Sequence, residues 1–162
     1  MNNLLDRIRP YLKTPLLILG MGNTLRSDDG MGVILARKLK RNTNFTVWEV
    51  GSNLENYLGK IIKQKPSSII IIDALDFGGR AGEIRMFRPQ DLNTVNLGFT
   101  HNSPLFLAIN YLQTRIKINI IILAVQPKRL DLNRRMTHQV RNSIKRIEDF
   151  FLKIAPDYAE VK

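Results

Sequence analysis

Four consecutive isoleucines, Ile69–Ile72, run directly into an acidic residue, Asp73. An uninterrupted apolar run of this kind is typical of a strand that is buried on both faces, as in a parallel sheet covered by helices on each side. A carboxylate that ends such a strand has to be paired, hydrogen-bonded or bound to a cation. The run therefore predicts an α/β protein built on a parallel sheet, and it makes Asp73 the first candidate for a functional acid.

Other strand and helix patterns alternate around this run. Residues 16–19 and 119–125 are apolar and predict two more buried strands, whereas residues 45–50 form a β-branched and aromatic strand pattern. Residues 83–88 alternate in polarity, and the connection that precedes them is too short for a helical crossover. This combination predicts an antiparallel strand at an edge of the sheet. Apolar residues at helical spacing lie between most of the strands and after the last one.

The alternation predicts a single three-layer α/β/α domain. Its sheet would have about five strands, mostly parallel and twisted, with one antiparallel edge strand. Residues 15–155 would form the body of the domain. Residues 1–14 would form a helical arm, with a helix over 3–13 that stops before Pro15 and packs on the body. The length of 162 residues suits one hydrophobic core.

Composition restricts the chemistry that is open to the chain. It has no cysteine, which excludes disulfides, thiolate catalysis and cysteine-ligated metal sites. No signal peptide or membrane-spanning run is visible, so we expect a cytoplasmic protein without a membrane span. The net charge is +11, with a local concentration of cations over residues 128–146. No aromatic residue interleaves those cations, and we expect no nucleic-acid partner.

The predicted strand over 16–19 leads into a glycine-rich loop that closes on an acidic pair. Glycines at such a turn let the backbone reverse sharply and approach whatever lies above the strand. The acidic pair then follows the carboxyl end of the strand, where open α/β sheets bind ligands. The residues that define this loop are Gly20, Gly22, Asn23, Asp28, Asp29 and Gly30.

Three interpretations of this loop compete. In the first, Ser27 or Asp28 caps the following helix and Asp29 is a first-turn acid favoured by the helix dipole. The second is a dinucleotide loop, which is disfavoured because Leu25 stands where a third glycine is needed and two carboxylates would face a pyrophosphate. The third is a metal site in which one acid caps and the other points into the crevice. The local sequence leaves the first and third interpretations open.

A histidine lies just before another predicted helix start. Ser103 is the expected N-cap, Pro104 the first helical residue, and His101 stands immediately outside. The positive end of a helix dipole disfavours an imidazolium and so keeps a ring neutral and able to ligate a metal. A loop histidine can equally be polar surface. The other histidine, His138, begins the last predicted helix among basic residues, and we interpret it as surface.

Asp29, Asp73 and His101 each follow a predicted strand or precede a helix that leads to one. In a parallel sheet all three would reach the same crevice. Two carboxylates and a neutral imidazole suit a borderline divalent ion such as nickel or zinc, with a coordination position open for substrate. We therefore expect these three side chains to form one metal-binding site.

Several motifs in the same order resemble the [NiFe]-hydrogenase maturation endopeptidases, a family of the peptidase M52 type. The subgroup most similar to this chain processes the large subunit of hydrogenase 3 of the formate hydrogenlyase system, because Gln126-Pro127 and Met136-Thr137 also match. The resemblance covers about residues 15–150. Its main motifs are Gly20-Met21-Gly22-Asn23, Asp28-Asp29-Gly30-Met31-Gly32, Ile72-Asp73-Ala74, Gly82-Glu83-Ile84-Arg85 and Thr100-His101-Asn102-Ser103-Pro104-Leu105.

The resemblance implies an endopeptidase that removes a C-terminal extension from a nickel-loaded hydrogenase large-subunit precursor. It also implies that Asp29, Asp73 and His101 are both the metal ligands and the catalytic residues. The nickel would be supplied by the substrate, and zinc or cadmium could substitute for it. The metal could polarise the scissile carbonyl or activate a water, or one aspartate could act as the base toward that water. We expect the protein to act as a monomer.

Two features stand apart from the resemblance. The segment 128–135 is more basic than the family pattern, and the N-terminal arm lies outside the matched motifs. Functions from other classes that the sequence leaves open are a nucleotide-binding α/β module and, less favoured, a basic nucleic-acid-binding protein. Strong binding of NAD or ATP would indicate the first, and a steeply salt-dependent affinity for DNA or RNA the second.

Overall fold

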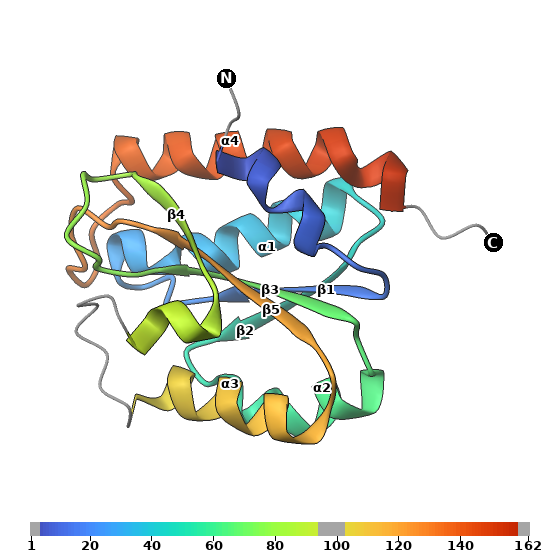
Figure 1. Ribbon diagram of the computed structural model, residues 1–162. Coiled ribbons are helices and arrows are strands. Elements are labelled where there is room, and N and C mark those ends of the chain that lie inside the picture. The colour runs from blue at the N-terminus through green and yellow to red at the C-terminus, as the bar shows by residue number, and fades with distance from the viewer. Residues whose placement is uncertain (1–3, 94–102, 159–162) are drawn as a thin grey trace.

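A computed structural model describes residues 4–93 and 103–158, which form a five-stranded sheet between two layers of helices (Figure 1). The strands are β1 (Leu16–Met21), β2 (Thr46–Gly51), β3 (Ser68–Ala74), β4 (Ile84–Phe87) and β5 (Asn119–Val125). The α-helices are α1 (Met31–Asn42), α2 (Leu58–Gln64), α3 (Pro104–Arg115) and α4 (His138–Ile154). Short 3-10 helices are η1 (Leu4–Arg7), η2 (Arg9–Tyr11), η3 (Ser27–Gly30), η4 (Leu54–Tyr57), η5 (Pro89–Asn93) and η6 (Ala155–Tyr158).

The strand order is β2-β1-β3-β5-β4, and the first three pairings along it are parallel. β4 pairs antiparallel with β5 and lies at the sheet edge, as predicted. The isoleucine run lies in β3 at the centre of the sheet, and all four side chains are fully buried. The three-layer fold with one antiparallel edge strand is therefore confirmed.

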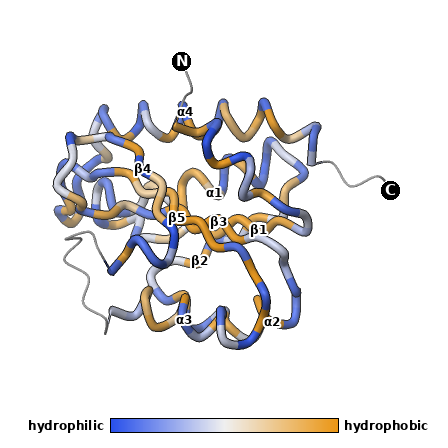
Figure 2. The backbone as a smooth tube through the Cα atoms, in the orientation of Figure 1, coloured by the Kyte–Doolittle hydropathy of each residue, from blue (hydrophilic) through white to orange (hydrophobic). Residues whose placement is uncertain are grey.

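Each face of the sheet is covered by a separate layer (Figure 1). α1 and α4 pack on one face with the even-numbered residues of β3, such as Ile70 and Ile72. α2 and α3 pack on the other face with the odd-numbered residues, such as Ile69 and Ile71. The hydropathy along the chain follows this plan, with an apolar sheet in the middle and polar stretches on the outer turns of the helices (Figure 2). Among the described helices, none is long and apolar enough to cross a membrane.

The N-terminal arm differs from the predicted single helix over 3–13. Its described part consists of two 3-10 turns, η1 and η2, instead of an α-helix. Pro10 provides the physical reason, because a proline inside an α-helix removes a hydrogen bond and clashes with the preceding turn. The apolar residues of the arm are still used, since Leu5, Ile8 and Leu12 are buried in the core on the α1/α4 face.

Glycines let α1 lie unusually close to the sheet. A Cβ at Gly32 of α1 would lie 2.3 Å from the carbonyl oxygens of both Ile72 and Met21. A Cβ at Gly20 of β1 would meet the Gly32 carbonyl oxygen at 2.2 Å. Because these neighbours are backbone atoms at the ends of β1 and β3, the glycines decide how closely the start of α1 approaches those strand ends.

We expect Gly32→Ala to lower the free energy of unfolding by about 1–3 kcal/mol, the usual cost of overpacking a core. Urea denaturation followed by circular dichroism would measure the loss. Gly59→Ala is the matched control, because Gly59 also lies in a helix, α2, and nothing lies within 4 Å of an added Cβ. The control should be neutral or stabilising by up to about 1 kcal/mol. Equal stabilities of the two variants would contradict the close-approach role of Gly32.

Candidate active site at the carboxyl ends of β1 and β3

The strand order creates one topological switch point, which is where a ligand is expected to bind in an open α/β sheet. The chain leaves the carboxyl end of β1 through α1 on one face to reach β2, and it leaves the carboxyl end of β3 in the other direction, through β4 and then α3 on the other face, to reach β5. β1 and β3 are neighbours, so the two connections diverge above their carboxyl ends, the place where open α/β sheets bind ligands, and we call the space above these ends the crevice. Asp29 lies in η3, which follows β1 after the loop over residues 22–26, and Asp73 is the penultimate residue of β3. Two of the predicted site residues therefore meet at this switch point.

Asp29 is held by the glycine loop that precedes it. The Asn23 backbone N–H donates to Asp29 Oδ2 at 3.0 Å, and the Leu25 N–H donates to Asn23 Oδ1 at 2.9 Å. Gly22 has φ +125°, and a Cβ there would lie 1.8 Å from the Asp29 carbonyl oxygen. The loop thus closes tightly around a half-buried carboxylate, which leaves Oδ1 of Asp29 without a protein hydrogen bond among the described residues.

The pKa of the Asp73 carboxyl is shifted by burial and by the neighbouring Asp29. This pKa is raised from 3.8 to about 8, first by burial at the end of β3, then by repulsion from Asp29, while the Ala74 N–H opposes the shift. Without a cation, Asp73 therefore holds a proton at neutral pH. The strand alternation places Asp73 on the α2/α3 face, the face on which α3 begins at Pro104.

His101 lies outside the described residues, so the proposed trio remains a prediction. Within residues 4–93 and 103–158 there is no cluster of three histidine, aspartate or glutamate side chains able to hold a metal ion. The helix that was predicted to follow His101 is present. Ser103 is its N-cap, and the Ser103 hydroxyl oxygen accepts a hydrogen bond from the Phe106 N–H at 3.2 Å. The other histidine, His138, is exposed at the start of α4, as interpreted from the sequence.

The raised pKa of Asp73 predicts an unusual pH dependence of stability. Because the folded chain binds this proton more tightly than the unfolded chain, the contribution is fully present below pH ~4 and is lost as the pH rises toward about 8. Asparagine resembles the protonated carboxyl, so metal-free Asp73→Asn should be more stable than the wild type above pH ~8, by about 1.4 kcal/mol for each unit of pKa shift. The advantage should shrink as the pH falls toward ~5.

Urea unfolding at several pH values would measure this difference. Asp76→Asn is the control with the opposite sign, because a hydrogen bond from Gln126 and then one from the Gly78 N–H lower the pKa of Asp76. That variant should be less stable than the wild type at neutral pH and should approach it at acid pH. A stability difference between Asp73→Asn and wild type that does not change with pH would contradict the raised pKa.

Asp28 has a structural role, but not as the predicted helix cap. Neither Ser27 nor Asp28 caps a helix with its side chain, and α1 begins after Gly30 without a side-chain cap. Instead the Asp28 carboxylate is fully buried and accepts hydrogen bonds from the segment that follows β5. Its donors are the Lys128 N–H at 2.8 Å, the Arg129 N–H at 3.2 Å, the Thr137 N–H at 2.7 Å and the Thr137 hydroxyl at 2.9 and 3.0 Å.

Sequence patterns could not show this role, because the partners of Asp28 lie about a hundred positions away in the chain. Ser27 joins the same connection, since its hydroxyl donates to the Arg135 carbonyl oxygen at 3.0 Å. The two adjacent acids therefore have different tasks. Asp28 ties the loop before α1 to the segment after β5, and Asp29 faces the crevice beside Asp73.

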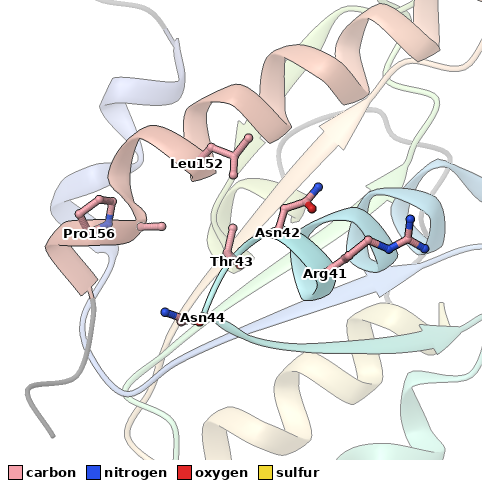
Figure 3. A pocket seen from close by; sticks show the side chains of 7 residues that line it. Arg41, Asn42, Thr43, Asn44, Leu152 and Pro156 are labelled. Atoms are coloured by element: carbon pink, nitrogen blue, oxygen red, sulfur yellow. The ribbon is translucent and has the colours of Figure 1, made fainter.

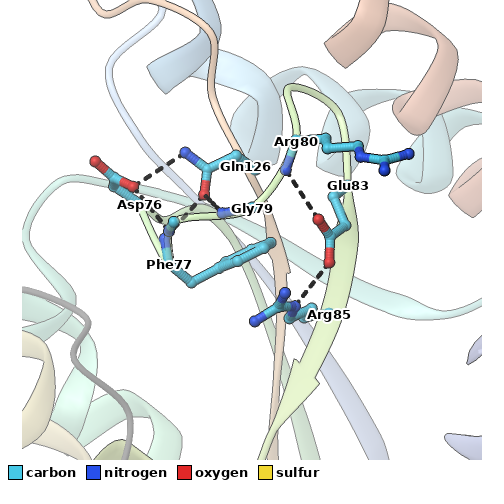
Figure 4. Close-up of polar contacts among 8 residues, drawn as sticks. Asp76, Phe77, Gly79, Arg80, Glu83, Arg85 and Gln126 are labelled. Atoms are coloured by element: carbon cyan, nitrogen blue, oxygen red, sulfur yellow. Dashed lines mark hydrogen bonds and ion pairs between the residues drawn. The ribbon is translucent and has the colours of Figure 1, made fainter.

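Gln126 holds the chain that follows Asp73, a contribution that the sequence did not reveal (Figure 4). Its Oε1 accepts hydrogen bonds from the Phe77 N–H at 2.9 Å and the Gly79 N–H at 3.0 Å. Its Nε2 donates to Asp76 Oδ1 at 3.1 Å. The sequence marked Gln126 only through the Gln126-Pro127 motif, and the structure shows that this amide is buried. Gln126 thus fixes the loop beyond β3 at the same edge of the sheet as the two acids.

Two surface hollows lie at different distances from the carboxyl ends of the strands, where the two acids are found. One, of about 450 Å³, lies beside the glycine loop at the carboxyl ends of β1 and β2 and is lined by Asn23, Arg37 and Glu49 among others. Glu49 stands where a dinucleotide fold places a ribose-binding acid, but it is ion-paired with Arg37 at 3.0 Å. The other, of about 390 Å³, lies between the end of α1 and the end of α4 (Figure 3). That hollow lies near the amino end of β2, away from the carboxyl ends of the strands, and neither Asp29 nor Asp73 lines it.

A three-layer α/β fold with two interacting carboxylates at its switch point defines a class of protein that has acidic side chains where open α/β sheets bind ligands. Comparison with known proteins gives this class a family. The HycI family model, described as hydrogenase maturation protease, matches residues 33–154. The hydrogenase 3 maturation protease of Escherichia coli strain K12 is 33% identical over 136 residues, which cover 81% of this chain and 85% of that protein.

Solved structures agree with the family match. The [NiFe] hydrogenase maturation protease HycI from Thermococcus kodakarensis superposes with a TM-score of 0.82 at 28% identity, covering 94% of this chain and 98% of that chain. The endopeptidase HycI from Escherichia coli superposes with a TM-score of 0.73 at 32% identity, covering 83% and 86%. The chain belongs to the HycI family of hydrogenase maturation proteases. It is accordingly an endopeptidase.

Proposed function

We propose that this endopeptidase removes the C-terminal extension of a nickel-loaded [NiFe]-hydrogenase large-subunit precursor. The observation that carries the proposal is the pairing of Asp29 and Asp73 at the switch point of a fold shared with hydrogenase maturation proteases. The nickel belongs to the substrate in this proposal. Asp29, Asp73 and His101 recognise it, and zinc or cadmium can take its place.

The chemistry of the two described acids supports a cation as the ligand. Two carboxylates close enough to raise a pKa repel each other, and a divalent cation between them removes that repulsion. Asp29 has an oxygen turned away from its one described hydrogen bond, and Asp73 is desolvated. Oxygen ligands of this kind, joined by one imidazole, suit a nickel or zinc ion. The described part of the site thus favours cation recognition over binding of a pyrophosphate.

In the proposed reaction the acids act as an aspartate-based site for peptide hydrolysis. The substrate's metal polarises the scissile carbonyl, or an aspartate takes the proton of the attacking water. Asp73 without a cation is protonated at neutral pH and cannot serve as that base. Bound substrate metal would return Asp73 to its charged form, so that either aspartate could then serve as the base.

The direct test is incubation of the purified protein with a nickel-loaded large-subunit precursor from the same organism. We expect the precursor to lose a C-terminal peptide, detected as a mass difference by intact-protein mass spectrometry. Metal-free precursor should remain intact. No cleavage of the nickel-loaded form by folded wild-type protein would refute the proposed function.

A further inference from the structure

A surface of exposed leucines and cations adjoins the crevice, and the proposed reaction does not use its side chains. Three exposed leucines lie there: Leu25 is 64% exposed, Leu130 is 40% exposed and Leu132 is 60% exposed. Five exposed cations surround them in the chain, namely Arg26, Lys128, Arg129, Arg134 and Arg135. Asp131 is the one exposed acid of the segment 128–135. We call these residues the basic apolar surface.

Hydrogen bonds hold the two segments of this surface side by side. The Asn133 N–H donates to the Leu25 carbonyl oxygen at 2.9 Å, and the Asp28 N–H donates to the Arg129 carbonyl oxygen at 3.3 Å. The buried Asp28 carboxylate receives the N–H groups of Lys128 and Arg129 from the same segment. These hydrogen bonds fix the surface in the fold, and its residue Arg26 lies three positions before Asp29 in the chain.

The charges of this surface are not neutralised within the described chain. None of its five cations takes part in an ion pair among residues 4–93 and 103–158. Other surface cations do find partners, such as Arg37 with Glu49 and Lys145 with Asp149. Unpaired charge next to exposed leucines is typical of a surface that meets a partner of opposite charge with apolar side chains of its own.

We infer that the basic apolar surface docks an acidic segment of the large-subunit precursor that also carries apolar side chains, while the scissile bond lies in the crevice. The inference rests on the proposed function. A protein substrate that reaches Asp29 has to contact protein surface outside the crevice as well, because specific interfaces bury about 800 Å² on each partner. The basic apolar surface lies directly in that zone, and its charge selects an acidic partner and speeds encounter.

A nucleic-acid partner fits this surface less well. Single-stranded nucleic acid is bound on aromatic platforms, and the segment 128–135 contains no aromatic residue. Three exposed leucines among the cations give no contact to a phosphate backbone but suit apolar side chains of a protein. We therefore use duplex and single-stranded DNA as the competing probe in the test.

The test compares two double charge reversals. Lys128→Glu/Arg134→Glu alters the basic apolar surface, where neither side chain forms a described hydrogen bond. Lys63→Glu/Lys117→Glu makes the same change of net charge near the amino ends of the strands, where Lys63 lies in the last turn of α2 and Lys117 precedes β5. For each protein, kcat and KM for cleavage of nickel-loaded precursor and the Kd for immobilised precursor are measured at low and high salt. Thermal melting checks that each variant is folded.

We expect the surface variant to raise KM and Kd by about tenfold at low salt, with kcat within about twofold of wild type. High salt should raise the wild-type values toward those of the variant. The control variant should stay within about twofold of wild type throughout. Leu132→Ser should also raise KM, and this increase should persist at high salt because it removes apolar contact.

Equal KM and Kd for the surface variant and the control would overturn the inference. Salt-dependent binding of DNA that is lost in the surface variant, with unchanged precursor binding, would overturn it in favour of a nucleic-acid partner. Absence of cleavage by wild type would refute the proposed function alone, because Kd for the precursor still tests docking. A selective loss of precursor binding by the surface variant would then support the docking surface without the protease reaction.

Discussion

Asp29→Asn and Asp73→Asn should each lower the rate of cleavage of nickel-loaded precursor by at least about 100-fold, the scale of a lost acid or base group. Each substitution removes one carboxylate that we propose as a ligand of the substrate's metal, while keeping the size of the side chain. His101→Ala should have an equally large effect if the predicted trio is correct. Single-turnover cleavage, followed by electrophoresis or mass spectrometry, would measure the rates.

Glu49→Gln is the matched control for these variants. Glu49 is another acid at the carboxyl edge of the sheet, but it is ion-paired with Arg37 and lies in β2. Its variant should keep cleavage within about threefold of wild type, because an exposed ion pair contributes little. Loss of cleavage in all the acid variants alike would indicate a general effect of charge instead of a site made by Asp29 and Asp73.

The metal state of the substrate should control the same reaction. Wild-type protein should leave metal-free precursor uncut, because the repulsion between Asp29 and Asp73 is relieved only when the substrate brings a cation. Bound nickel would also orient the nearby peptide bond. Efficient cleavage of metal-free precursor in the presence of a chelator would contradict this gating, although the protein would still be a protease.

The second large effect concerns stability. Asp28→Ala should lower the free energy of unfolding by roughly 3–5 kcal/mol, because it leaves buried N–H donors of the segment 128–137 without an acceptor. For a chain of this size, such a loss corresponds to a fall in Tm of about 10 °C or more. Differential scanning calorimetry would measure it. The melting should begin with exposure of the segment after β5, visible as faster hydrogen exchange there.

Asp131→Ala provides the control, because Asp131 is an exposed acid of the segment that Asp28 ties down. Its effect should stay within about 0.5 kcal/mol. Asp28→Asn should fall between the two, since the amide keeps one acceptor oxygen but turns an N–H₂ group toward N–H donors. A Tm of Asp28→Ala within 2 °C or so of wild type would contradict the anchoring role of Asp28.

Much of the fold could be predicted from local patterns. The isoleucine run in β3, the apolar β1 and β5, and the alternating β4 each carry a signal within a few residues. The N-cap at Ser103 and the helix start at Pro104 were likewise visible as neighbouring residues. Only Pro10 was overlooked in the arm, where it limits the helix to 3-10 turns. These features succeeded because backbone sterics and burial act over short stretches of chain.

The positions of Asp29 and Asp73 could be predicted from the sequence, whereas the role of Asp28 could not. The placement of Asp29 and Asp73 at one sheet edge followed from the parallel topology, in which strand ends meet. The distinct task of Asp28 could not be predicted, because its donors lie in a segment that folds onto it from beyond β5. The hydrogen bonds of Gln126 could not be predicted for the same reason, although its motif was noted, since its partners Phe77 and Gly79 belong to another connection.

By itself, the sequence determined the α/β class, the antiparallel edge strand and the presence of Asp73 at the end of a buried strand. Those properties depend on hydrophobic periodicity and on the short range of backbone geometry. Tertiary structure alone decided that Asp28 is an internal anchor while Asp29 lies near Asp73, and that burial and this neighbour raise the pKa of Asp73. The pKa of a carboxyl and the satisfaction of a buried N–H depend on which atoms lie nearby in space, and only the folded chain brings those atoms together.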